Sequence, residues 1–239
     1  MMAFGKQDLL KGSEVIVDEC RLVSQNGADL DLTNYFSNID IYEDIYSNTL
    51  TGTIELVDGL NIAQHLPLMG QETLNLTFFT PGLKRNKLKF MVNEIGTRVS
   101  DKAQKIQTYT LHLISEEFMA NTNKRISKAY EGEIDTIVED VLREYLTEEK
   151  SFFKEPTAFT HKFVIPNWTP FRTINWLTSR AVSKDNMEVS NYMFYETIDG
   201  FYLTSLSKLM EQPVKQEYRF DPSGTLQTES GTRDIFREL

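Results

Sequence analysis

The chain has 239 residues, 40% of them hydrophobic, and a formal net charge of -10. This length suffices for a substantial core in one large or two medium domains, and the acidic balance argues against binding nucleic acid through neutralised phosphates. The single cysteine, Cys20, excludes an internal disulfide and a cysteine-rich zinc site. No apolar run approaches the roughly 20 residues of a transmembrane helix, and no signal peptide is recognisable. We therefore expect folding in a reducing cytoplasm and no membrane partner.

The first half of the sequence predicts short strands separated by turns. Residues 14–23 are rich in β-branched and apolar side chains and are followed by the turn pair Asn26-Gly27. Residues 38–45 and 49–57 alternate between apolar and polar side chains, which indicates half-buried strands. Further strands are expected at residues 72–79, 88–95 and 106–114, with a short helical turn at residues 61–66. Many short strands with little helix are typical of a sandwich or barrel.

The second half changes character after a linker expected at residues 120–128. Residues 133–146 carry apolar side chains at the spacing of an amphipathic helix. Residues 163–165 predict a strand that Pro166 stops, and Thr169-Pro170 then predicts the start of a helix that extends to about residue 183. Asp199-Gly200 predicts a type I′ hairpin over residues 191–206. One further strand is expected at residues 215–220, within a polar C-terminal tail.

These patterns predict two domains. Residues 1–120 form an antiparallel β domain, either a sandwich or a barrel, and residues 121–239 form an α+β domain with helices near 133–147 and 169–183. The fold class is therefore α+β and mostly β.

The sequence offers no catalytic, cofactor-binding or metal-binding signature. The three histidines, His65, His112 and His161, are far apart and form no spaced ligand pair. No phosphate-binding loop or nucleophile elbow is present. Acidic pairs such as Glu116-Glu117, Glu139-Asp140 and Glu148-Glu149 are more typical of solvated charge than of a glycosidase. We expect no enzyme activity, no cofactor and no metal ion, and we interpret the aromatic residues of the second half as core.

Two stretches of the sequence resemble a known family. Residues 168–183 and 191–210 read WTPFRTINWLTSRAVS and NYMFYETIDGFYLTSLSKLM, and residues 38–81 read NIDIYEDIYSNTLTGTIELVDGLNIAQHLPLMGQETLNLTFFTP. They are similar to the baseplate hub proteins of contractile-tailed bacteriophages, which are related to the hub part of type VI secretion spike proteins. The resemblance implies that the N-terminal domain is a barrel of the tail-tube type and that a smaller α+β hub domain follows it.

The resemblance also implies a role in assembly. Family members form trimers that join the tail tube to the central spike and line the DNA channel, and each subunit can carry two tube-like barrels that match the six-fold tube. The implied partners are further copies of this chain, the tube protein, the spike protein and other baseplate proteins, in a virion tail assembled in the host cytoplasm. DNA would pass through the channel without specific binding, and part of the acidic charge would line it.

Two sets of residues follow from the resemblance. The segments 38–45 and 49–57 are expected at the ring-forming edge of the barrel, with contact residues Tyr42, Ile45, Tyr46 and Leu50. Within the second domain, structural core positions are expected at Trp168, Phe171 and Trp176. Two alternatives stay open: a tail-associated peptidoglycan hydrolase, and a hub component of a bacterial contractile injection system.

Overall fold

The structure is a computed structural model that describes residues 15–59, 70, 72–80, 84–101, 106–214, 218–219 and 233–234. The helical turn expected at residues 61–66 lies outside these residues. Internal contacts divide the chain into one unit from Met1–Ser205 and another from Leu206–Leu239. The second unit contains helix α5 (Leu206–Met210) and a short parallel pair of strands, β13 (Tyr218–Arg219) and β14 (Arg233–Asp234). No described helix has the length and apolar composition needed to cross a membrane.

The first part of the larger unit is a seven-stranded sheet in which all neighbours are antiparallel. Its order is β2-β1-β5-β6-β7-β4-β3. The strands are β1 (Ile16–Val23), β2 (Asp29–Asp31), β3 (Phe36–Tyr42), β4 (Thr51–Asp58), β5 (Thr73–Phe79), β6 (Asn86–Asp101) and β7 (Ile106–Ser115).

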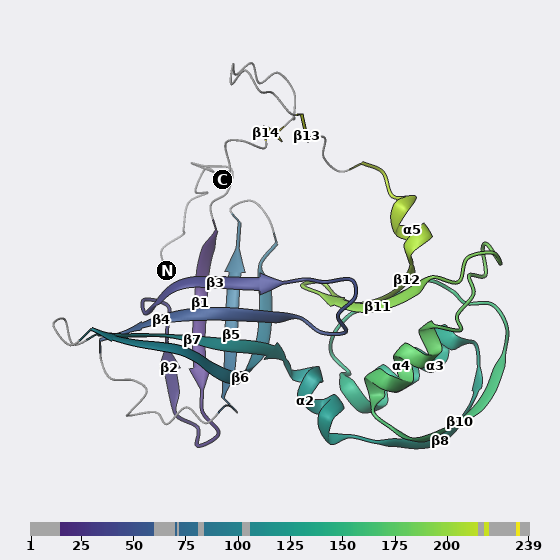
Figure 1. Cartoon of the computed structure of the whole chain (residues 1–239), viewed down its shortest axis with the longest axis horizontal. Coiled ribbons are helices and arrows are strands. Elements are labelled where there is room, and N and C mark those ends of the chain that lie inside the picture. The colour runs from purple at the N-terminus through teal and green to yellow at the C-terminus, as the bar shows by residue number, and fades with distance from the viewer. Residues whose placement is uncertain are drawn as a thin grey trace, which may run out of the picture. The chain divides into compact units, whose positions relative to one another are not determined.

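This sheet is curled into a half-barrel, because its longest strand takes part in both halves. Residues 86–91 of β6 pair with β5, and residues 90–101 pair with β7 in a ladder that has irregularities between Val92/Glu94 and Ile95/Arg98. Bulges of this kind bend a strand and increase its twist. As a result, β3, β4 and β7 run across β1, β2 and β5 (Figure 1).

The concave side of the sheet encloses an apolar cluster. A short corner after β2 carries the chain to β3, at the opposite edge of the sheet, and Leu32 in this corner is fully buried. The Leu32 N–H donates to the Cys20 carbonyl oxygen at 2.7 Å, which ties the corner back to β1. The buried members of the cluster are Cys20, Leu22, Leu32, Leu50, Ile54, Leu56, Leu74, Leu76, Phe90, Val92, Tyr109, Leu111 and Leu113.

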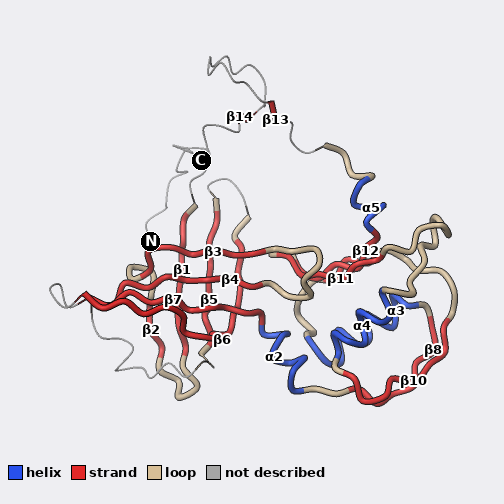
Figure 2. The backbone as a smooth tube through the Cα atoms, in the orientation of Figure 1, coloured by secondary structure: helices blue, strands red, loops and turns tan. Residues whose placement is uncertain are grey.

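The second part of the larger unit mixes helices and strands (Figure 2). In chain order it contains α2 (Glu116–Asn123), β8 (Ile126–Gly132), α3 (Ile134–Val141) with the π-helical turn η1 (Leu142–Leu146), β9 (Phe152–Lys154), β10 (His161–Trp168), α4 (Pro170–Thr178), β11 (Tyr192–Thr197) and β12 (Gly200–Ser205). Strands β8 and β10 form an antiparallel ribbon, while β11, β12 and β9 form a three-stranded sheet. The predicted fold class, mostly β with an N-terminal antiparallel sheet followed by an α+β part, is confirmed.

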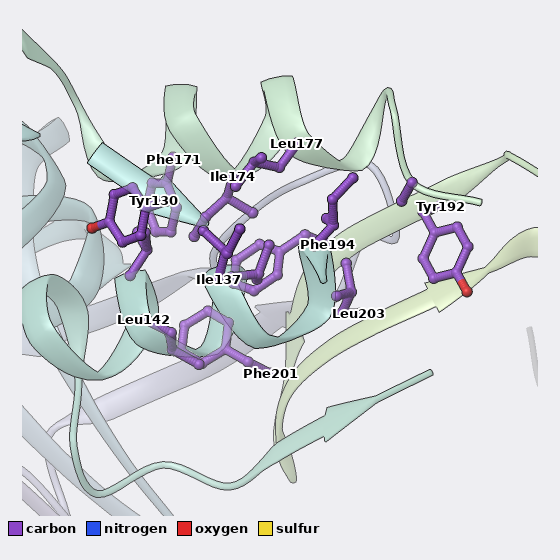
Figure 3. Packing of buried hydrophobic residues seen from close by; sticks show 14 of the residues in the cluster. Tyr130, Ile137, Leu142, Phe171, Ile174, Leu177, Tyr192, Phe194, Phe201 and Leu203 are labelled. Atoms are coloured by element: carbon purple, nitrogen blue, oxygen red, sulfur yellow. The ribbon is translucent and has the colours of Figure 1, made fainter. Parts of the chain in front are cut away.

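A separate apolar cluster holds this α+β part together. Figure 3 shows Ile137 of α3 and Ile174 of α4 pointing toward Phe194 of β11, with Phe201 and Leu203 of β12 beside them. Of the predicted core residues, Phe171 is buried in this cluster, whereas Trp168 and Trp176 are half-buried and pack against it.

The expected linker at residues 120–128 is wrong. Helix α2 extends through Asn123, and β8 starts only three residues later, at Ile126. The Asn121 side chain accepts a hydrogen bond of 2.8 Å from the N–H of Phe171 in the first turn of α4. The Thr169 side chain, expected to cap α4, makes no cap hydrogen bond. The chain around α2 is therefore a packed element that supports α4.

Two local predictions need correction. Pro166 does not stop its strand, because β10 continues to Trp168 with an irregularity after the proline, and prolines are tolerated at bulges and edges. The hairpin is present, but Thr197 pairs with Gly200, so that Ile198 and Asp199 form the turn. A positive φ of 139° is found at Gly200, which approaches Ser151 so closely that a Cβ would collide with the Ser151 carbonyl oxygen. The glycine is thus needed for contact with the chain before β9.

Candidate functional site

A cavity of about 340 Å³ lies between the curled sheet and the α+β part. Its walls come from β6, from the β7–α2 connection, from the chain after η1 and from the turn of the β11–β12 hairpin. Several charged side chains line it: Lys87, Lys89, Glu116, Glu117, Glu149, Lys150, Glu196 and Asp199. It is the place where a ligand or a catalytic pair would be expected.

Lys150 is the centre of a buried charge network in this cavity. Its Nζ atom lies 2.6 Å from Glu117 Oε2 and 2.5 Å from Glu196 Oε1, and it donates to Ser115 Oγ at 3.0 Å. The side chains of Glu117 and Glu196 are only 4% and 1% exposed. The second oxygen of Glu196 accepts a 2.9 Å hydrogen bond from the backbone N–H of Leu50. The network therefore joins Leu50, the residue before β4, and the end of β7 to β11.

Two carboxylates and a single lysine form this network, and this imbalance of charge affects the pKa values of its members. Burial raises the pKa of Glu196, and the nearby Glu117 adds to this effect while Lys150 opposes it. Burial also acts to lower the pKa of Lys150, but the charges of Glu196 and Glu117 outweigh it and hold that pKa above its usual value. Lys150 is therefore a firmly charged cation that neutralises one of two buried carboxylates.

The loop between β3 and β4 contains most of the predicted ring contacts. Tyr42 is 53% exposed and Tyr46 is 78% exposed, while Ile45 is half-buried. Leu50 differs from these residues, because its side chain is 2% exposed and belongs to the core of the sheet. Leu50 thus presents no side-chain surface to a neighbouring molecule.

The same loop is fastened to the α+β part. The amides of Asn48 and Asn175 bond each other reciprocally at 2.9 Å, and Asn48 Nδ2 also donates to the Phe194 carbonyl oxygen at 3.0 Å. The N–H of Ile198 donates to Glu43 Oε1 at 2.7 Å. The loop therefore has a fixed position on β11 and α4, and its two exposed tyrosines project from an anchored frame.

Half of the six acidic residues considered as catalytic candidates, namely Glu116, Glu117 and Glu139, are engaged in ion pairs. Glu116 lies 2.6 Å from Lys89, and Glu139 lies 2.9 Å from Lys154. Among the described residues, no group of three or more histidine, cysteine or acidic side chains is arranged to hold a metal ion. His65 lies outside the described residues.

Sequence reasoning overlooked Lys150 and Glu196. A signal for Glu196 was nevertheless present, because Tyr192, Phe194 and Glu196 share one face of β11 and all three are buried. A charged residue in the apolar register of a strand requires a buried partner. Lys150 follows η1 in an irregular segment, where no periodicity identifies its partner.

The comparisons with known proteins reveal structural relatives. No family model and no curated protein sequence matches this chain. The tail protein from Neisseria meningitidis MC58 is similar in structure, with a TM-score of 0.54 and 10% identity over 88% of this chain and 57% of that chain. The 43 kDa tail protein of prophage MuSo2 from Shewanella oneidensis has a TM-score of 0.50 and 12% identity over 78% of this chain and 54% of that chain. This chain therefore shares its fold with tail proteins and spans about half of their length.

Proposed function

We propose that this chain is a structural subunit of a phage tail baseplate hub. The observation that carries the proposal is the continuous order of a curled antiparallel sheet and an α+β part, which is shared with two tail proteins over 88% and 78% of this chain. The subunit forms a ring, a homotrimer in our proposal, that connects the tail tube to the central spike and lines the DNA channel. Its place is then the virion tail, after assembly in the host cytoplasm.

The surface of the sheet supports such a role. Among the strands that the structure describes, β3 lies at the edge of its sheet with β4 as its single partner, so within the described residues its outer row of backbone groups is open to pairing or cover. Open edges of this kind are satisfied by neighbouring chains in many assemblies. Tyr42 and Tyr46, exposed beside this edge, add the aromatic area typical of protein interfaces. We retain Tyr42, Ile45 and Tyr46 as proposed contact residues, and we place the domain boundary near residue 120.

The test is the native mass of the purified chain, measured by light scattering over a concentration series, alone and with candidate tube and spike proteins. We expect a trimer, either by itself or on addition of a partner. A chain that stays monomeric with every tail protein would contradict the proposal. Binding to the tube and spike proteins of a bacterial injection system, in preference to phage proteins, would assign the same role to that setting.

One observation favours a second candidate, a peptidoglycan hydrolase. Glu196, with its raised pKa, and Glu117 both line the cavity, and glycosidases use one protonated and one ionised carboxylate. Against this, both carboxylates bind Lys150 and are nearly inaccessible. We therefore propose that the chain is not an enzyme. Digestion of purified cell walls by the native chain, lost in Glu196→Gln, would establish the hydrolase instead.

A further inference from the structure

Tryptophan and arginine side chains alternate from Trp168, at the end of β10, through Arg172 and Trp176 of α4 to Arg180, just after that helix. Trp168 and Trp176 pack edge to face with their ring centres 5.7 Å apart. The guanidinium of Arg172 lies 4.8 Å from the centre of the Trp168 ring, and that of Arg180 lies 4.0 Å from the Trp176 ring. We call these four residues the basic strip. Both arginines are exposed and both tryptophans are half-buried, so the strip is accessible from solvent.

The positive charge of the basic strip is not neutralised within the described part of the chain. Neither Arg172 nor Arg180 belongs to any of the ion pairs found there. Arg180 donates instead to the Trp176 carbonyl oxygen and to Ser179 Oγ, each at 3.0 Å. Stacking on an aromatic face holds a guanidinium in place and leaves its outer N–H groups available. Tryptophan and arginine are also the residue types most enriched at the energetic centres of protein interfaces.

A surface of opposite charge lies on the curled sheet. Residues 40–46, which we call the acidic loop, contain Asp40, Glu43 and Asp44 beside the exposed Tyr42 and Tyr46. Within the described residues these three carboxylates are likewise absent from the ion pairs. Asp44 Oδ1 accepts a 2.8 Å hydrogen bond from the Tyr46 N–H, which fixes the turn of the loop. Both surfaces therefore combine aromatic rings with uncompensated charge of opposite sign.

The two surfaces do not neutralise each other within one copy. The loop between β3 and β4 contacts α4 through the Asn48–Asn175 amide pair. Among the described residues, the arginines of the basic strip nevertheless form no ion pair with the carboxylates of the acidic loop. Contact with a second copy brings the opposite charges together without any change of fold. A contact between two different surfaces of identical subunits is heterologous, and such contacts close into rings when the rotation permits.

We propose that the basic strip of one copy binds the acidic loop of the next copy. This inference rests on the proposed function as a ring subunit and names the contact that closes the ring. A second copy fits the strip better than nucleic acid does, because the net charge of -10 repels phosphate over the rest of the surface. Electrostatic complementarity of this kind selects the partner and fixes its orientation.

The test exchanges the two charges. Arg172→Glu with Arg180→Glu reverses the charge of the strip. Asp40→Arg with Asp44→Arg reverses the charge of the loop and keeps the hydrogen bond from Ile198 to Glu43, but it removes the hydrogen bond from Tyr46 to Asp44. Recovery of association in the chain with all four substitutions therefore decides whether charge or the turn is responsible. We expect each double variant to weaken self-association by about tenfold or more, since like charges then face each other. The chain with all four substitutions should regain association to within about threefold of the native value, because opposite charges meet again.

A control matched in charge to the strip variant is Arg85→Glu with Arg98→Glu, an exposed position directly before β6 and an exposed position within it. It should leave association unchanged, and thermal unfolding should show that every variant is folded. Sedimentation or light scattering provides the measurement, with the tube or spike protein present if the native chain requires it.

The possible results distinguish a failure of the proposed strip–loop contact from a failure of the proposed ring function. If the native chain forms its ring and the reversed variants form it equally well, this contact is overturned and the ring function remains. If the native chain forms no ring under any condition, both are overturned. If the strip variant loses binding to a single-stranded oligonucleotide while its self-association is unchanged, the strip is a nucleic-acid surface and the contact is likewise overturned.

Discussion

The curled sheet and the α+β part are stabilised by different means. The sheet combines long antiparallel ladders with a cluster that is almost wholly aliphatic and aromatic. The α+β part has shorter strands, and several of its loops are fixed by buried carboxylates. Glu155 accepts hydrogen bonds from the N–H of Ser205 and the hydroxyl groups of Ser183 and Thr204, while Asp135 accepts from Thr157. Where regular hydrogen-bond ladders are short, ionised side chains satisfy the backbone instead, and stability then depends on protonation.

The largest expected effect comes from truncating the core of each part. Phe90→Ala in the sheet and Phe201→Ala in the α+β part remove side chains that are 1% and 0% exposed, and each should lower the free energy of unfolding by about 3–5 kcal/mol. Both tryptophans lie in the α+β part, so their fluorescence reports that part alone. Denaturation followed by fluorescence and by circular dichroism distinguishes the two parts. If Phe90→Ala shifts both signals together, the two parts unfold as one cooperative unit and are not stabilised independently of each other.

The next effect concerns the cation between the two parts. Lys150→Met leaves Glu117 and Glu196 buried without their cation, and we expect a loss of about 2–3 kcal/mol, less than for a fully buried pair because Lys150 keeps 29% exposure. Adding Glu196→Gln should recover part of this loss, since one buried negative charge disappears. Lys162→Met, at an exposed ion pair, serves as the control and should change stability by less than about 1 kcal/mol. An equal loss in both lysine variants would show that burial is not the cause.

Acid should destabilise the α+β part before the sheet. Burial acts to raise the pKa of Asp135 and of Glu155, but hydrogen bonds from Thr157 and Lys154, and from Ser205 and Ser183, outweigh it and lower both pKa values. A carboxyl group whose pKa is lower in the folded chain than in the unfolded chain stabilises the fold. This stabilisation is complete when the pH is above the unfolded-state pKa of about 4, and it is lost as the pH falls through the folded-state pKa. Thermal unfolding between neutral pH and pH 2, followed by tryptophan fluorescence for the α+β part and by circular dichroism for the whole chain, tests this, and Asp135→Asn should flatten the fluorescence profile. The raised pKa of Glu196 acts in the opposite direction, so Glu196→Gln should not flatten it.

The smallest effect is expected at the anchored loop. Asn48→Ala removes the reciprocal amide pair with Asn175 and the bond to the Phe194 carbonyl oxygen, and we expect a loss of about 0.5–1.5 kcal/mol. Hydrogen exchange at residues 43–50 should increase by more than the global loss explains. Asn38→Ala, which removes an exposed bond to Asp40 on the same strand, is the control.

Much of the fold could be predicted from the sequence, because it depends on local periodicity. The alternating pattern at residues 49–57 corresponds to β4, and the helical spacing from Ile134 to Leu146 corresponds to α3 and η1. The incorrect predictions concern local features that depend on residues far away in the sequence. Asn121 caps α4 across 50 residues, and Gly200 is required by the close approach of Ser151 in addition to its own positive φ. No local pattern contains either partner.

The candidate site was less predictable for the same reason. Tyr42 and Tyr46 were named from the family resemblance, and both side chains are exposed. The resemblance indicates a segment and not individual side chains, so Leu50 was named with them although it is buried in the same cluster as Ile54 and Leu56 of β4. The basic strip was missed because Trp168 and Trp176 were interpreted solely as core, whereas each also supports an arginine on its exposed face.

The proline in β10 also bears on how growth of an assembly is limited. Within the described residues, strand β10 pairs with β8 alone, and Pro166, which is opposite Ser127, has no backbone N–H to donate. The following Asn167 has a φ of 54°, which breaks the regular outline of the strand. A stray strand that added here would find a donor missing and the edge twisted away. The ribbon thus resists open-ended polymerisation, a safeguard for a chain whose proposed assembly must stop at a closed number of copies.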